Sequence, residues 1–213
     1  MLTANANVLL RPILSRATAV SRISSCIMCA GSGSGKLESR RSIHIEKRIE
    51  GLGIELPTAP MPKANYNIVC IPPGENVMYL SGHLPVKADG TLIAGAIGPD
   101  TGGLTVKDGY DAARTCGLNL IATLKKQLGD LDRVEQVVKV FGIVNSHVDF
   151  KHQHLVMDGC SDLMMEVFDK PIGYHARSAI GTNTLPLDVS VEIEMIVKFK
   201  PEVEEEEEED EEY

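Results

Sequence analysis

Apolar residues along the middle of the chain recur at a helical period in some segments and alternate with polar residues in others. The clearest helical pattern is a long run in which apolar side chains return every three or four positions. Thr105 precedes this run as an N-cap candidate, and Gly129 follows it. The pattern predicts three helices, of which the last two are long: His44–Leu52, Thr105–Leu128 and Asp149–Phe168.

Segments with the pattern of β-strands lie between and after these helices along the sequence. The turn-forming cluster at residues 72–76 separates the first two of them and predicts a β-hairpin. In the last segment, Val191, Ile193 and Met195 alternate with polar residues and should point to one side. The six predicted strands are Asn67–Ile71, Val77–Ser81, Thr91–Ala94, Val134–Val144, Ala176–Leu185 and Val189–Phe199.

After the short first helix, the predicted order is β-β-β-α-β-α-β-β. This order indicates an α+β fold in which two long helices pack on one face of a mixed sheet. The other face of such a sheet is bare. If that face is apolar, self-association is the simplest way to cover it.

The two ends of the chain differ from the middle in charge. Residues 1–45 are rich in Arg and Ser and contain no acid before Glu38, which is typical of an organelle transit peptide. We expect this extension to be disordered and to direct the protein to a mitochondrion, with plastid or cytoplasm as alternatives. The competing interpretation is a disordered N-terminal arm that carries no targeting signal. Residues 201–213 are almost purely acidic and should form a disordered tail. Residues 46–200 are therefore the expected folded domain.

Composition excludes several classes of function. No apolar run reaches the eighteen or so residues that a membrane span needs, so no membrane anchor is expected. The net charge is −9, and the middle of the chain has no clustered basic patch, which argues against nucleic acid as a partner. Two of the five cysteines lie in the N-terminal extension, and the other three form an odd number at wide spacings. They are therefore not a disulfide framework, which indicates a reducing compartment.

Two charged residues near the C-terminal end are candidates for chemistry. Arg177 lies inside an otherwise apolar strand pattern, where an unpaired charge would be costly. Its guanidinium can bind a carboxylate through two parallel hydrogen bonds. Glu192 lies on the polar side of the last strand and would approach Arg177 if the last two strands paired. From the pattern alone, a structural Arg–Glu salt bridge is the favoured interpretation.

Several segments taken together closely resemble the signature of the Rid family, also called YjgF-like or the L-PSP endoribonuclease family. The main one is Ala-Arg-Ser at residues 176–178, followed by Val-Glu-Ile at 191–193. The resemblance covers about residues 46–199, and a long lead-in at residues 51–57 indicates a divergent subgroup. The supporting segments are Ala64–Tyr66, Val77–Leu84, Gly129–Val134 and Val144–Phe150.

This resemblance implies a chorismate-mutase-like fold, a homotrimer, and clefts shared between subunits. It implies hydrolytic deamination of small enamines and imines, such as 2-aminoacrylate, to 2-keto acids. Arg177 would hold the substrate carboxylate, and Glu192 would handle the attacking water and its proton. Tyr66, Gly82 and Ala179 would contact the substrate. An iminium carbon is already electrophilic, so neither a metal nor an organic cofactor is expected.

Three residues depart from the family pattern. Ala179 stands where many members have Cys, so a thiol role is absent at that position. His83 stands in place of Gln, and Asn183 stands where a small or basic residue is usual. His175 could also reach the cleft, although ordinary packing explains it equally well. The alternative function is a non-catalytic trimeric module that binds a small carboxylate metabolite. An RNA-cleaving role is disfavoured by the acidic middle of the chain.

Overall fold

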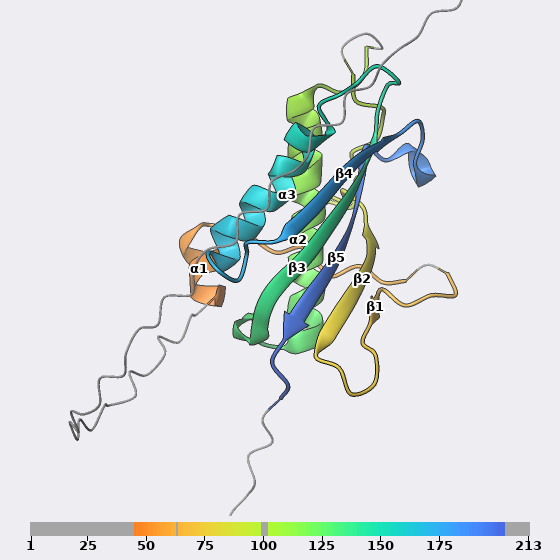
Figure 1. Ribbon diagram of the computed structural model, residues 1–213. Coiled ribbons are helices and arrows are strands. Elements are labelled where there is room, and N and C mark those ends of the chain that lie inside the picture. Colours follow the sequence, from red (N-terminus) through yellow and green to blue (C-terminus); the bar gives the residue numbers. More distant parts are fainter. Residues whose placement is uncertain (1–44, 63, 99–101, 203–213) are drawn as a thin grey trace, which may run out of the picture. The chain divides into compact units, whose positions relative to one another are not determined.

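The computed structural model describes residues 45–62, 64–98 and 102–202. The predicted transit-like extension, apart from Ile45, and the predicted acidic tail, apart from residues 201–202, lie outside the described residues. Figure 1 shows the elements, which are α1 (Ile45–Gly51), β1 (Val69–Cys70), β2 (Val77–His83), α2 (Val106–Leu128), η1 (Leu131–Arg133), β3 (Val134–Asn145), α3 (Gln153–Phe168), β4 (Ala176–Thr182), η2 (Pro186–Asp188) and β5 (Val191–Phe199).

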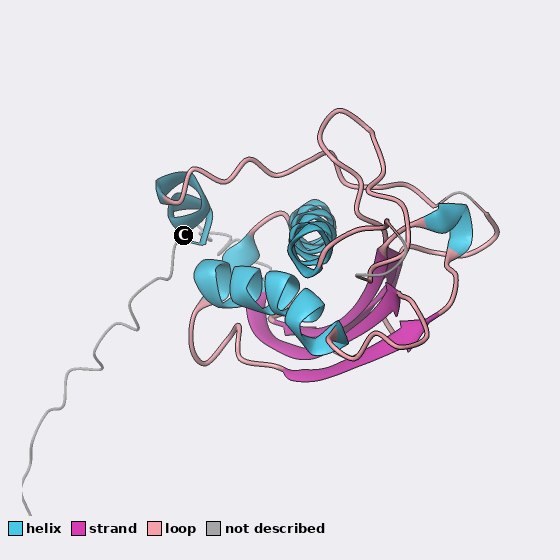
Figure 2. Cartoon of the chain, turned by 90° about the horizontal axis from the view of Figure 1, so that it is seen from above, coloured by secondary structure: helices cyan, strands magenta, loops and turns pink. Residues whose placement is uncertain are grey.

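The five strands form one mixed sheet in the order β1-β2-β5-β3-β4. All neighbouring strands are antiparallel except β3 and β4, which are parallel and joined through α3. Viewed along the sheet, α2 and α3 lie on the same side of its curved surface (Figure 2). The predicted α+β class, with two long helices on one face, is therefore confirmed.

The ends of α2 follow from local sequence chemistry. The Thr105 side chain accepts a hydrogen bond from the Asp108 backbone N–H, and the Asp108 carboxylate accepts one from the Thr105 N–H at 2.8 Å. This reciprocal capping box satisfies two donors that the first helical turn would leave unpaired. At the other end, Gly129 has a φ of 74°, a conformation that favours glycine.

The predicted alternation along β5 is also confirmed. Val191, Ile193 and Met195 are buried against the helices, whereas Glu194 is exposed on the other side of the sheet. Among the described residues, no helix covers that second face (Figure 2), which we call the open face. Its side chains, grouped by the pairing register, are Tyr79, Ile196 and Lys139, then Glu194, Phe141 and Ser178, then Glu192, Ile143 and Ile180.

One predicted strand is wrong, and one strand pairing that was considered does not occur. The segment 91–94 is not a continuous strand; it forms only isolated bridges, including Ala94 with Val189. The last two strands do not pair, because β3 lies between β4 and β5. The crossover through α3 makes β4 parallel to β3, and β4 lies at the edge of the sheet.

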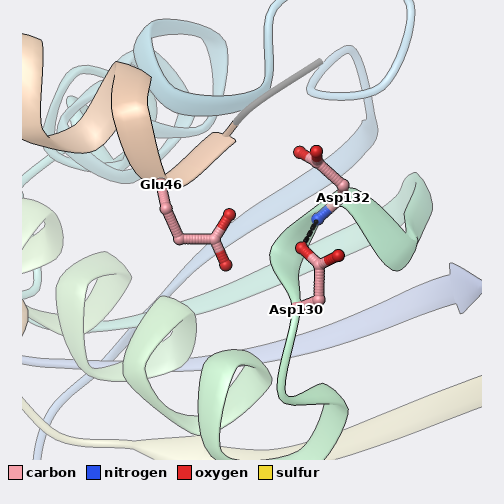
Figure 3. Close-up of side chains that lie close together, drawn as sticks. All are labelled: Glu46, Asp130 and Asp132. Atoms are coloured by element: carbon pink, nitrogen blue, oxygen red, sulfur yellow. Dashed lines mark hydrogen bonds between the residues drawn. The ribbon is translucent and has the colours of Figure 1, made fainter. Parts of the chain in front are cut away.

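Three carboxylates lie together where α1 meets η1, with their oxygen atoms within 4.8 Å of one another (Figure 3). Glu46 accepts hydrogen bonds from Lys125 Nζ at 2.6 Å and from the Leu131 N–H at 2.9 Å. Asp130 accepts one from the Asp132 N–H at 2.9 Å, and Asp132 accepts one from the first N–H of α1 at 2.7 Å. Protein donors thus engage all three groups, and the cluster fastens α1 to the rest of the domain.

No helix within the described part of the chain combines the length and the apolar character that a membrane span requires.

Candidate functional site

A half-buried carboxylate on the open face is placed by an irregularity in β2. The register between β2 and β5 shifts between Leu80 and His83, which inserts one extra residue into β2. Gly82 lies in this bulge, and the Glu192 side chain rests directly against it. A Cβ at position 82 would lie 2.7 Å from Glu192 Cδ and 2.8 Å from Cγ, and it would overlap Oε1. The absence of a side chain at Gly82 therefore allows Glu192 to take this position.

The surroundings of Glu192 favour its protonated form. Burial raises the pKa of the Glu192 carboxyl, and the neighbouring Glu194 carboxylate raises it further. A carboxyl whose pKa is raised toward neutrality is better suited to accept and return a proton in a reaction near neutral pH. This electrostatic property distinguishes Glu192 from an ordinary surface glutamate.

A small pocket of about 80 Å³ lies beside Gly82. Tyr66, which is half exposed, forms part of its wall, so two predicted site residues meet here. Gly82 thus borders the pocket and also supports Glu192. The pocket is lined by Pro60, Met61, Tyr66, Ile68, Gly82, His83, Leu84, Val86 and Asn119. The structure brings Tyr66, Gly82 and Glu192 into one neighbourhood.

Arg177 lies elsewhere, between β4 and α3. Its Nη1 donates to Asp158 Oδ1 at 2.8 Å and to Ser161 Oγ at 3.0 Å, and a quarter of its side chain is exposed. Ser161 also bonds to His175 Nε2 at 3.0 Å, while His175 Nδ1 donates to the Gly173 carbonyl at 2.6 Å. The arginine is therefore a member of a polar network at the sheet edge, and its ionic partner is Asp158.

Arg177 and Glu192 do not meet within one chain, so the structural Arg–Glu salt bridge that the pattern alone favoured is not formed there. Arg177 pairs across the sheet with Val140, whose side chain is buried under the helices. Glu192 pairs with Ile143 of β3. Ile143 is an odd number of residues beyond Val140 on the same strand, so Glu192 points to the open face. Successive side chains of a strand point to opposite faces, so the guanidinium and the carboxylate lie on opposite sides of the sheet.

Ala179 belongs to the Arg177 side of the sheet. It pairs with Gly142, over which the Met157 side chain of α3 is packed, and it is partly buried against the core. Ala179 is therefore not near the Tyr66 and Gly82 pocket in the same chain.

Two buried polar residues near the pocket were not predicted as site components. His83 is 1% exposed; its Nδ1 donates to the Ser81 carbonyl at 2.6 Å and its Nε2 lies 2.8 Å from Thr123 Oγ1. Burial lowers the pKa of His83, so the neutral ring holds the bulge in place. Asn119, which is 3% exposed, comes from α2. In the sequence, Asn119 is only a polar residue among the apolar positions of a predicted helix, and this pattern did not identify it as a site residue.

The fold and this site define an α+β protein with a mixed sheet, two long helices on one face and a half-buried carboxylate on the other. Residues 46–198 match the model of the family described as "YjgF/chorismate_mutase-like, putative endoribonuclease". The chain belongs to this YjgF-like family, which confirms the resemblance found in its motifs.

Individual proteins support the same conclusion. Protein TCP17 of Trypanosoma cruzi is 39% identical over 148 residues, which cover 69% of this chain and 89% of that protein. The crystal structure of Atu1372, a protein of unknown function from Agrobacterium tumefaciens, is 38% identical with a TM-score of 0.65, over 75% of this chain and 94% of that one. A Shewanella oneidensis protein described as a "putative endoribonuclease" is 31% identical with a TM-score of 0.67, over 73% and 99%.

Proposed function

We propose that this protein hydrolyses small enamines and imines to 2-keto acids, with Glu192 handling the proton transfers. The observation that carries the proposal is the Glu192 carboxyl, which is held against Gly82 beside the Tyr66 pocket and has a raised pKa. Membership of the YjgF-like family supports it.

The proposed reaction needs one base and one water molecule. An enamine first tautomerises to its imine. Glu192 then accepts a proton from water while the water oxygen forms a bond to the imine carbon. The same carboxyl returns that proton to the imine nitrogen, which gives a carbinolamine. It then takes the hydroxyl proton and delivers it to the amino nitrogen as the C–N bond breaks, so ammonia leaves and the carbonyl forms. A positioned water and a general base suffice, because the imine carbon is already electrophilic.

We further propose that Arg177 anchors the substrate carboxylate and that the protein works as a homotrimer. Nη1 of Arg177 donates hydrogen bonds to Asp158 and Ser161, whereas its Nε and Nη2 have no partner among the described residues. This second edge of the guanidinium can bind a carboxylate through two hydrogen bonds. Since Arg177 and Glu192 of one chain lie on opposite faces, one small substrate can contact both only if two copies contribute.

The test couples a serine or threonine dehydratase to the purified protein and follows loss of the imine. Arg177→Ala and Glu192→Gln should each lower the rate by at least about 100-fold. Arg114→Ala is the matched control, because Arg114 forms a similarly exposed ion pair between α2 and α3, with Glu166 at 2.6 Å. No acceleration by the wild type, or an Arg177→Ala rate equal to the wild-type rate, overturns the proposal.

Mixed oligomers test where the two residues come from. Arg177→Ala and Glu192→Gln chains are refolded together. If the site is shared between copies, some sites take Glu192 from an Arg177→Ala chain and Arg177 from a Glu192→Gln chain, and activity returns. If both residues act within one chain, every chain stays defective and the mixture is inactive.

The existing ion pair of Arg177 favours a second candidate function, a non-catalytic module that binds a small carboxylate. Asp158 already supplies a carboxylate to the guanidinium, and a ligand carboxylate would add to or replace it. Thermal stabilisation by 2-keto acids without any turnover of imines would support this alternative.

A further inference from the structure

We infer that the pocket beside Gly82 binds a small neutral group that carries an N–H donor, for which a carboxamide is the best match. The inference rests on the proposed function where it concerns the substrate, because it assigns the side chain of that substrate a chemical class. The binding event itself does not depend on catalysis and can be measured separately.

The first argument is an unused acceptor in Asn119. Its Nδ2 atom donates to the carbonyl oxygens of Thr115 and Val86, both at 2.9 Å, and to that of Leu84 at 3.3 Å. These bonds fix the orientation of the amide, since only a donor can face three carbonyl groups. The other atom, Oδ1, accepts no hydrogen bond from the described residues. Asn119, a residue that is 3% exposed, lines the pocket, so its Oδ1 is an acceptor available to a ligand there.

The second argument is the lack of charge in the lining. The nine residues around the pocket include no Asp, Glu, Lys or Arg. The one titratable imidazole, His83, has both nitrogens engaged, and its pKa is lowered by burial. An ammonium or carboxylate group in the pocket would meet no opposite charge among these nine residues; the charged groups next to the lining are Glu192, against Gly82, and Lys126, whose Nζ lies 3.1 Å from Met61 Sδ. A neutral group therefore fits this lining best.

The third argument is the combination of Tyr66 with the apolar walls. The Tyr66 hydroxyl has no partner among the described residues and can donate to a carbonyl or accept from an N–H. A carboxamide supplies both an N–H for Asn119 and a C=O for Tyr66. Pro60, Met61 and Ile68 offer apolar contacts for a short alkyl chain. At about 80 Å³, the pocket is roughly half the size of a cavity that holds benzene, so it suits a group of a few heavy atoms.

These features constrain the substrate of the proposed reaction. Its side chain would be aliphatic with a neutral amide end, and that end would occupy the pocket. The C=N bond would then lie on the Glu192 side of Gly82, and the carboxylate of the substrate would lie outside the pocket.

The experiment compares three isosteric probes by amide chemical shifts of the uniformly ¹⁵N-labelled full chain. Isobutyramide should shift the resonances of Gly82, Leu84 and Val86 with a millimolar Kd, whereas isobutyrate and isobutylammonium should bind at least about tenfold more weakly. Met61→Trp places a larger side chain in the pocket wall and should weaken the binding of isobutyramide at least about tenfold. Residue 61 is largely exposed, so this change should not disturb the core. Tyr66→Phe should weaken it by about three- to tenfold.

Three outcomes overturn the inference: no shift with isobutyramide, equal shifts with all three probes, or unchanged binding to Met61→Trp. Glu192→Gln separates the two proposals. It should abolish imine hydrolysis and leave isobutyramide binding intact, so a failure of the pocket assignment and a failure of the deaminase assignment give different results.

Discussion

At the scale of single residues, the site depends on one glycine and one carboxyl group. Glu192 lies in the space where a side chain at position 82 would otherwise lie. The same residue is electrostatically unusual, because burial and Glu194 raise its pKa. Steric room and a raised pKa are independent properties, and each can be tested by substitution.

Gly82→Ala should destabilise the fold by up to about 1 kcal/mol, because the new Cβ overlaps the end of the flexible Glu192 side chain, which must move out of its place. Glu192→Ala removes every atom that the Cβ would meet, so the cost of Gly82→Ala should largely disappear in that background. Urea denaturation of the two single variants and the double variant measures this coupling. Additive effects in the double variant would contradict the placement of Glu192 against Gly82.

The raised pKa of Glu192 predicts a pH dependence of stability. The folded protein binds the Glu192 proton more tightly than the unfolded chain does. The free energy of unfolding should therefore fall as pH rises from the unfolded pKa through the folded pKa. Glu192→Gln lacks this titration, so its stability relative to the wild type should increase between about pH 4 and pH 7.5. Denaturant melts at both values measure it, and a difference independent of pH would contradict it.

At the scale of elements, glycines decide how closely α2 and α3 pack. A Cβ on Gly159 of α3 would meet the backbone of α2, at 2.9 Å from Tyr110 C and 3.1 Å from Arg114 N. On α2, a Cβ at Gly117 would lie 2.8 Å from the Leu163 side chain. The two helices therefore approach to near backbone contact.

Gly159→Ala should lower the free energy of unfolding by about 1–3 kcal/mol, because backbone atoms of α2 cannot move aside as a flexible side chain can. Gly51→Ala is the matched control. A Cβ at Gly51 meets nothing within 4 Å, so this change should be neutral or stabilising by up to about 1 kcal/mol. Thermal and urea unfolding of both variants would test the contrast, and equal effects would rule out the close helix contact as the cause.

At the scale of the whole molecule, the open face of the sheet exposes apolar side chains. It carries Tyr79, exposed by 44%, and Ile180, exposed by 46%, together with the partly buried Phe141, Ile143 and Ile196. Apolar side chains gathered on one face favour association with another copy. The shared site proposed above needs such an association.

Ile180→Glu should weaken self-association, because it would bury a charge in the contact between copies. Leu155→Glu is the control, since Leu155 is similarly exposed, by 41%, but lies on α3. Sedimentation equilibrium should show a smaller species for Ile180→Glu and an unchanged one for Leu155→Glu. An Ile180→Glu protein that remains fully associated would exclude the open face as the interface.

The sequence by itself determined the periodic elements and the family. Alternation along residues 191–197 placed Glu192 on the polar side of β5, and the motif around Arg177 identified the YjgF-like family. Both follow from local rules, because the side-chain period of a strand and a short motif are contained in the segment itself.

Only the tertiary structure decided which strands are neighbours, and this determined the site. The sequence could not show that β3 separates β4 from β5, because pairing between distant segments depends on the whole set of packed elements. The partner of Arg177, the bulge beneath Glu192 and the acceptor of Asn119 all follow from that arrangement.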